Sequence, residues 1–179
     1  MNVIIIYDSY FGNTLKVAEM YQKEFLASKQ QAEIKHVDQT GPKDIEDRDL
    51  IIVGSPTRGF RESSAMMSFL RRKDLRFSNK NVFVFDTRIS PEDVKSKLLR
   101  QMMKWFGYAA SNMEKRLKKH GATIVMPAIG YPVVSSEGPV KPEVAFMIEI
   151  DVRKLINPND DKTIAGATDE EAKTNPKTT

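Results

Sequence analysis

Five short apolar runs, rich in β-branched residues, alternate with longer segments that have a helical repeat. The runs are Val3 to Tyr7, Glu33 to Val37, Leu50 to Gly54, Val82 to Phe85 and Thr123 to Met126. Four of them are almost continuously apolar, which is typical of strands covered on both faces. Strands that alternate with helices are joined by right-handed crossovers into a parallel sheet. We therefore predict an α/β fold: a doubly wound, five-stranded parallel sheet with helices on both faces.

The helical segments have identifiable starts. We expect Asn13 or Thr14 to cap the first helix, and Ser63 or Ser64 to cap the second. The segment Ser90-Pro91-Glu92-Asp93 combines a capping serine, a proline for the first turn and two acids on the positive end of the helix dipole. It predicts that a third helix begins there.

The third helical segment is long, and its apolar periodicity continues until Gly121. It is either one helix or two helices that break near Gly107. The last helix begins near Pro142 and stops at Asn157. We predict one domain over residues 1–157, followed by a polar, disordered tail over residues 158–179.

Composition excludes several classes of protein. The chain of 179 residues has no cysteine, which excludes disulfides, thiolate metal sites and a cysteine nucleophile. No apolar run approaches the roughly 20 residues that span a bilayer, and the first residues lack the features of a signal peptide. We therefore expect a cytoplasmic location without membrane insertion.

The chain is basic, with a formal net charge of +4. A basic chain indicates nucleic acid, an anionic cofactor or an acidic partner as a ligand. No nucleic-acid motif and no basic stripe interleaved with aromatic residues is present, so we expect no nucleic acid. An anionic cofactor and an acidic partner both stay open.

Ligands of an open parallel sheet bind at the carboxyl ends of its strands. The first strand is followed by the loop Asp8 to Thr14, which leads directly into a helix. Backbone N–H groups at a helix N-terminus, with the hydroxyls of Ser9 and Thr14, form a cradle for a monoester phosphate. The loop lacks the Gly-Lys-Ser/Thr of a P-loop and the three glycines of a dinucleotide site. The alternative interpretation is an ordinary capped helix start.

Two further loops follow the central strands. The loop from Gly54 to Phe60 contains a proline and glycines that stiffen and bend it, so that the loop can run along a planar ring. Phe60 is available to stack on that ring. The alternative is a plain connection with a solvent-facing Arg58. The segment Asp86 to Ile89 follows the next strand, and the segment Pro127 to Val133 follows the last one.

Taken together, these segments resemble the flavodoxin-like family of FMN proteins. The family's Ser/Thr-x-Thr-Gly-x-Thr pattern appears as Ser9-Tyr10-Phe11-Gly12-Asn13-Thr14, with Phe11 where a third hydroxyl is usual. Gly54-Ser55-Pro56-Thr57 looks like the first flavin-ring loop, and Phe85-Asp86-Thr87-Arg88 resembles the second ring loop of one branch. Gly138-Pro139, after Ser135-Ser136-Glu137, also fits that branch.

The resemblance implies a sheet in the order 2-1-3-4-5, one non-covalent FMN, and transfer of one or two electrons between redox partners. It also implies that the Arg58–Gly59 peptide turns its carbonyl toward flavin N5 when a proton arrives there. We expect neither a metal nor a catalytic side chain. The cofactor-binding residues that it implies are Ser9, Tyr10, Phe11, Gly12, Asn13, Thr14, Ser55, Pro56, Thr57, Arg58, Gly59, Phe60, Asp86, Thr87 and Arg88.

Three functions stay open, and an electron carrier is the one that we favour. The first alternative is an FMN-dependent reductase that acts on a quinone, a nitro compound or NAD(P)H. About 20 extra residues between Asp86 and Tyr108 support it, because reductases of this fold tend to build part of the site from a second subunit or an inserted segment. The second alternative is a binding module without FMN, which the hydrophobic Phe11 supports.

Positive charge is concentrated in the stretch 58–76. It has six cationic residues, Arg58, Arg61, Arg71, Arg72, Lys73 and Arg76, against Glu62 and Asp74. We predict from this that the redox partner is acidic around its own cofactor. We also expect Arg58, the arginine closest to the ring loop, to favour the reduced flavin electrostatically. The alternative is a solvated helix face without a partner.

Overall fold

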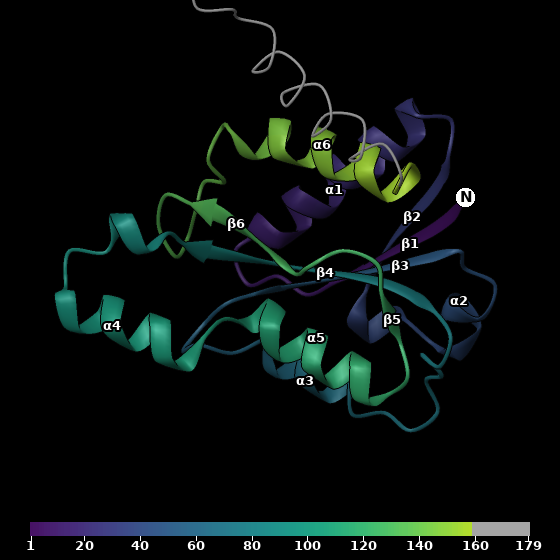
Figure 1. Cartoon of the computed structure of the whole chain (residues 1–179), viewed down its shortest axis with the longest axis horizontal. Helices are drawn as coiled ribbons and strands as arrows, with labels where there is room; N and C mark the ends of the chain where they lie inside the picture. Colours follow the sequence, from purple (N-terminus) through teal and green to yellow (C-terminus); the bar gives the residue numbers. More distant parts are fainter. Residues whose placement is uncertain (159–179) are drawn as a thin grey trace, which may run out of the picture.

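A parallel β-sheet with helices on both faces forms the body of the computed structural model, which describes residues 1–158 apart from the side chains of residues 99 and 103–106 (Figure 1). Its strands are β1 (Asn2–Tyr7), β2 (Gln31–His36), β3 (Leu50–Pro56), β4 (Asn81–Ile89), β5 (Thr123–Ile124) and β6 (Ile129–Val133). Its helices are α1 (Asn13–Ala27), α2 (Pro42–Glu46), α3 (Ser64–Phe69), α4 (Lys97–Phe106), α5 (Ala109–Lys119) and α6 (Val144–Ile156). The predicted tail lies almost entirely outside the described residues.

The strand order β2-β1-β3-β4-β5 confirms the predicted topology, and every pairing is parallel. The number of strands differs, because two segments share the fifth position. β5 pairs with the beginning of β4 at Val82, and β6 pairs with its end from Phe85 to Ile89. The segment Pro127 to Val133, which was expected to follow the last strand, contains β6, and Gly130 and Pro132 interrupt the apolar pattern of this strand. Proline is tolerated there since β6 lies at the edge of the sheet.

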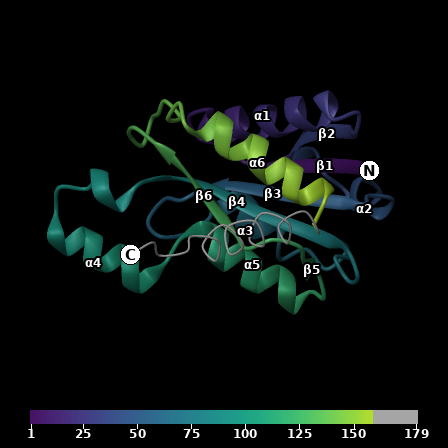
Figure 2. The same cartoon turned by 45° about the horizontal axis from the view of Figure 1, so that its top comes forward.

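Two hydrophobic layers hold the helices on the sheet. α1 and α6 cover one face, and α3 and α5 cover the other, as Figure 2 shows. Tyr21 and Phe25 of α1 are fully buried on the first face, and Met113 and Leu117 of α5 on the second. The periodicity predicted these contacts. Since both faces are covered, strand ends and helix ends are the places left for a ligand.

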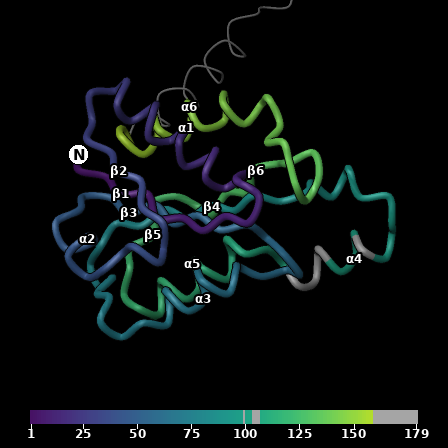
Figure 3. The backbone as a smooth tube through the Cα atoms, turned by 180° about the vertical axis from the view of Figure 1, so that it is seen from behind, coloured from purple at the N-terminus to yellow at the C-terminus, as the bar shows by residue number. Residues whose placement is uncertain are grey.

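The long third helical segment is divided where the sequence left two possibilities open. α4 and α5 are separate helices, and Gly107 between them has a φ of 73°. The predicted helix start at residue 90 is wrong. Pro91–Asp93 forms a single 3-10 turn, the Ser90 side chain makes no capping bond, and Val94 returns to extended backbone. α4 stands away from the sheet in Figures 1 and 3.

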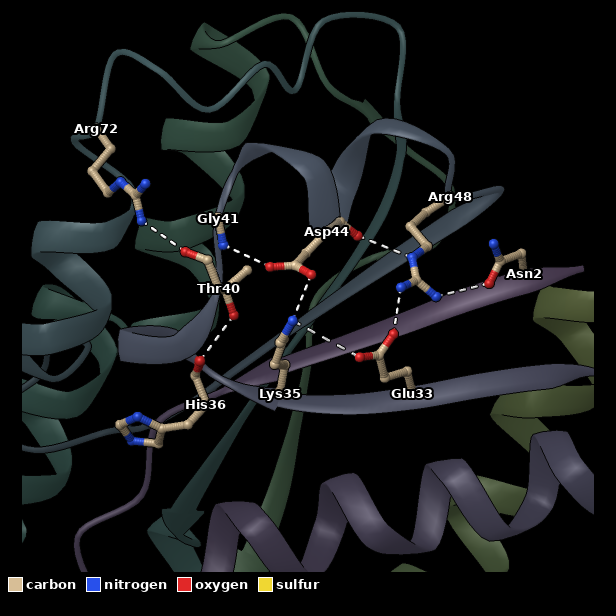
Figure 4. Close-up of polar contacts among 9 residues, drawn as sticks. All are labelled: Asn2, Glu33, Lys35, His36, Thr40, Gly41, Asp44, Arg48 and Arg72. Carbon is tan, nitrogen blue, oxygen red and sulfur yellow. Dashed lines mark hydrogen bonds and ion pairs between the residues drawn. The ribbon is translucent and has the colours of Figure 1, made fainter.

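A network of charged side chains fixes the exposed edge of the sheet, where β2 has one free side (Figure 4). Lys35 Nζ of β2 donates to Asp44 Oδ1 at 2.5 Å, and Gly41 N donates to Asp44 Oδ2 at 2.7 Å. Arg48 pairs with Glu33 of β2 and donates to the Asn2 side chain of β1. These contacts join β1, β2 and α2.

We predict that Gly54→Ala destabilises the fold strongly. A Cβ on Gly54 would lie 2.1 Å from Cζ of the buried Phe85 ring, so the strand or the ring must move. We expect the free energy of unfolding to fall by about 1–3 kcal/mol in urea denaturation. Gly41→Ala is the control, because its Cβ would be 3.8 Å from the nearest atom, Asp44 Oδ2. A change at Gly54 no larger than that at Gly41 would contradict the packing.

We predict that Asp44 makes the fold sensitive to acid. Its hydrogen bond from Lys35, then that from the Gly41 N–H, lowers the pKa of Asp44 below its ordinary value. A lowered pKa contributes stability above the unfolded value of about 4, and this is lost as the pH falls through the folded value. Asp44→Asn should reduce the unfolding free energy by about 1 kcal/mol near neutral pH and by less in acid. Asp47→Asn, at the exposed C-cap position of α2, is the control variant in the same pH series of urea denaturation.

Candidate functional site

A hollow of about 170 Å³ lies at the carboxyl ends of β1, β3, β4 and β6, where the sheet predicts a ligand. Four separate segments of the chain contribute to it. Its lining residues are Ser9, Tyr10, Phe11, Asn13, Thr14, Pro56, Thr57, Arg58, Thr87, Arg88, Ile89, Val133, Ser136 and Glu137.

The first turn of α1 faces this hollow without a side-chain cap. Gly12 occupies the N-cap position with a φ of 82°, and no side chain accepts a hydrogen bond from the turn. The expected cap by Asn13 or Thr14 is therefore wrong, because both residues lie inside the helix. The first N–H groups of a helix have no acceptor within it, so they are available to an anion at the positive end of the dipole.

Two hydroxyls lie beside this turn. Thr14 is fully buried, and its Oγ1 lies 3.0 Å from Thr87 Oγ1 of β4. Ser9 Oγ is also buried, and among the described residues it is one of two buried side-chain polar atoms with no hydrogen-bond partner. A buried hydroxyl without a partner is costly, so a ligand that accepts its hydrogen bond is stabilising.

The loop after β3 forms a tight turn at the rim of the hollow. Arg58 and Arg61 exchange two backbone hydrogen bonds, at 3.0 and 3.2 Å, around Gly59 and Phe60. Both intervening residues have positive φ, 57° and 66°. The Arg58 guanidinium lies 5.5 Å from the ring centroid of Tyr10, which brings the loops after β1 and β3 together.

Arg88 of β4 is held on both sides. Its Nε and Nη2 donate to the two carboxylate oxygens of Asp86 at 2.5 and 2.8 Å, and its guanidinium carbon lies 3.6 Å from the Tyr108 ring centroid. Asp86 also accepts the N–H of Ala110 in the first turn of α5, at 2.8 Å. Burial raises the pKa of the Asp86 carboxyl, and Arg88 opposes this rise most strongly. The cluster therefore fixes one cation at the hollow and anchors α5.

A loop outside the expected site residues completes the hollow. Ser136 and Glu137 line it after β6, and Gly138 packs against the start of α1. A Cβ on Gly138 would lie 2.3 Å from Asn13 Oδ1, and the φ of Gly138 is 105°, so both space and backbone require glycine here. The sequence signal for this loop is the turn Ser135-Ser136-Glu137-Gly138-Pro139, whose resemblance to the family does not by itself place it at the site.

The structure gathers most of the expected residues at the hollow, from all three predicted loops. Five of them do not line it: Gly12, Ser55, Gly59, Phe60 and Asp86. Ser55 Oγ instead accepts the N–H of Ser63, the residue that caps α3, at 3.0 Å. Ser55 and Asp86 therefore support the site from beneath. Ile89 and Val133 line it without having been predicted.

Among residues 1–158, no group of three or more histidine, aspartate or glutamate side chains is placed to hold a metal ion. Within the same described part of the chain, no helix has the length and apolar character needed to cross a membrane.

Comparison with known proteins gives a consistent result. The family model described as Flavodoxin matches residues 5–152. Flavodoxin 2 from Bacillus cereus superposes with a TM-score of 0.68 at 19% identity, over 85% of this chain and 95% of that one. The Megasphaera elsdenii flavodoxin, solved in its two-electron reduced form, has a TM-score of 0.60 at 22% identity, over 84% and 98%. Rubredoxin oxygen:oxidoreductase from Desulfovibrio gigas has a TM-score of 0.65 at 18% identity, over 85% of this chain and 34% of that one. No curated protein matches by sequence.

Proposed function

The chain belongs to the flavodoxin family, and on this premise we propose that it carries electrons, one or two at a time, between redox partner proteins. Flavodoxins are FMN proteins, and the isoalloxazine ring of FMN supplies the redox chemistry. The protein's part is to bind the cofactor, to set its potentials and to control which partners reach it. The observation that carries the proposal is the uncapped first turn of α1 beside the unpartnered Ser9 hydroxyl.

The residues at the hollow fit FMN. A phosphate monoester needs several donors, and the loop from Ser9 to Thr14 offers backbone N–H groups and two hydroxyls. Phe11, where the family usually has a third hydroxyl, lines the hollow and is half exposed. We propose that residues 9–14 hold the phosphate, and that the loops at 55–60 and 86–88 hold the ring.

The experiment that tests this function is the visible spectrum of the purified protein, followed by release and identification of its flavin. We expect FMN. A protein that neither contains nor takes up FMN would instead be the binding module that the sequence left open. A cytoplasmic location is part of the proposal and stays a prediction.

An FMN-dependent reductase is the second candidate. The segment 90–107 favours it, because that segment leaves the sheet between β4 and α5 and carries α4 outside the body (Figure 1). Stopped-flow mixing with NADH and NADPH separates the two functions. A carrier is reduced slowly by both nucleotides, whereas rapid reduction by either would establish the reductase.

We predict that Thr14→Ala weakens FMN binding by about 1–3 kcal/mol, the usual effect of losing a donor to a charged group. The change also leaves Thr87 Oγ1 without its buried neighbour. Thr14→Ser keeps the hydroxyl and should restore most of the affinity, measured by quenching of flavin fluorescence. Thr123→Ala, at the other end of the sheet, is the control. Equal affinities of Thr14→Ala and the parent would place the phosphate elsewhere.

We predict that Arg58→Gln lowers the potential of the second electron by several tens of millivolts at low salt. A charge about 8 Å away at an effective dielectric of 20 contributes about 2 kcal/mol, which salt reduces, and 59 mV corresponds to about 1.4 kcal/mol. Arg58 lines the hollow, so it is placed to stabilise added negative charge. Arg76→Gln is the control, because it removes one charge of the same basic stretch at a position that does not line the hollow. A redox titration in which Arg58→Gln matches or exceeds the parent would refute this role.

A further inference from the structure

A second hollow, of about 310 Å³, runs between α3 and α5 on the face of the sheet opposite α1. Its lining is strongly basic, with five cations against one carboxylate. The lining residues are Arg61, Glu62, Met67, Arg71, Asn112, Lys115, Arg116 and Lys119. We call it the α3–α5 groove. Arg61 and Arg71 belong to the basic stretch 58–76, whereas the other three cations come from α5.

The positions on α5 explain why this charge gathers in one place. Asn112, Lys115, Arg116 and Lys119 are spaced by three, one and three residues, which puts them on one face of a helix. α3 lies beside α5 on the same side of the sheet in Figures 1 and 2. The groove therefore joins cations that are more than 40 residues apart in the sequence.

Most of this charge is not neutralised by the protein itself. Glu62 is the acid of the groove, its side chain is 2% exposed, and it pairs with Arg116 at 3.5 Å. Within residues 1–158, the exposed side chains of Arg61, Arg71, Lys115 and Lys119 take part in no ion pair. Arg72 differs, because Asp74 pairs with it at 2.6 Å. Four free cations around one groove favour an anionic occupant.

The groove is continuous with the loop at the rim of the proposed flavin site. Arg61 lines the groove and exchanges backbone hydrogen bonds with Arg58, which lines the other hollow. Asn112 lines the groove too, and its Nδ2 donates to the Phe60 carbonyl at 3.2 Å. A molecule bound in the groove therefore lies next to the turn formed by residues 58–61.

We propose that the α3–α5 groove is the docking surface for the acidic face of the redox partner. Charge complementarity argues for this occupant, because the cations are exposed and spread over two helices and a loop. Exposed cations of this kind steer and orient an acidic protein surface. A docked partner would lie beside the 58–61 turn, at the rim of the proposed flavin site. This proposal rests on the proposed function as an electron carrier. Binding of the partner can nevertheless be measured without electron transfer.

The test measures binding of the oxidised, acidic haem domain of cytochrome b5, as a probe, to the purified protein. Amide chemical shifts at low salt report both the affinity and the residues involved. The variant Arg71→Glu with Lys115→Glu reverses two groove charges. The matched control, Lys73→Glu with Arg76→Glu, makes the same change of net charge at exposed positions that do not line the groove.

We expect shifts centred on α3 and α5, and loss of binding as salt screens the charges over about 10 Å at 0.1 M. The groove variant should raise the Kd at least about tenfold, and the control less than about threefold. Equal losses in both variants, or no loss in either, would overturn the proposal. Tight binding of ADP or inorganic phosphate in the groove, without binding of the haem domain, would also overturn it. Absence of FMN would refute the proposed function alone, since this binding is measured without electron transfer.

Discussion

Parallel pairing of β1, β3 and β4 is the constraint on which the site depends. The register pairs Tyr7 with Gly54 and Gly54 with Phe85, so the carboxyl ends of all three strands point to one edge of the sheet, where β3 and β4 extend beyond β1. Helices cover both faces of the sheet, and the loops that follow these strands therefore meet at one edge. The position of the uncapped first turn of α1, of the turn at residues 58–61 and of the Asp86–Arg88 pair follows from this one arrangement.

The sequence predicted the parts of the fold that depend on local pattern. The buried positions of β1 and β3 and of α1 followed from continuous apolar runs and helical period. The sequence did not predict β6, because Gly130 and Pro132 interrupt the apolar pattern that indicates a strand. Parallel pairing with β4 stabilises this strand. The sequence also predicted a helix from residue 90, where a serine cap and a proline form only one 3-10 turn. Tertiary contacts decided both positions against their local signals.

Residues that line the hollow were predictable where a loop directly follows a strand. Ser9, Thr14 and Thr87 all reach the hollow as the motifs indicated. Ser136 and Glu137 were missed because the folding of a later loop onto Asn13 brings them there. The sequence indicated only the cations of the α3–α5 groove that belong to the stretch 58–76, Arg61 and Arg71. Packing of the helices brings the cations of α5 beside them. Local sequence patterns therefore do not predict which residues from distant parts of the chain come together.

The proposed function depends above all on binding of the FMN phosphate by the first turn of α1 and its two hydroxyls. The most direct test compares the affinities of FMN and riboflavin, which share the ring and differ in the phosphate. Charge-assisted hydrogen bonds contribute about 1.5–3 kcal/mol each, so FMN should bind at least about a hundredfold more tightly. Riboflavin binding within about tenfold of FMN would show that the cradle does not hold the phosphate, and would contradict the account.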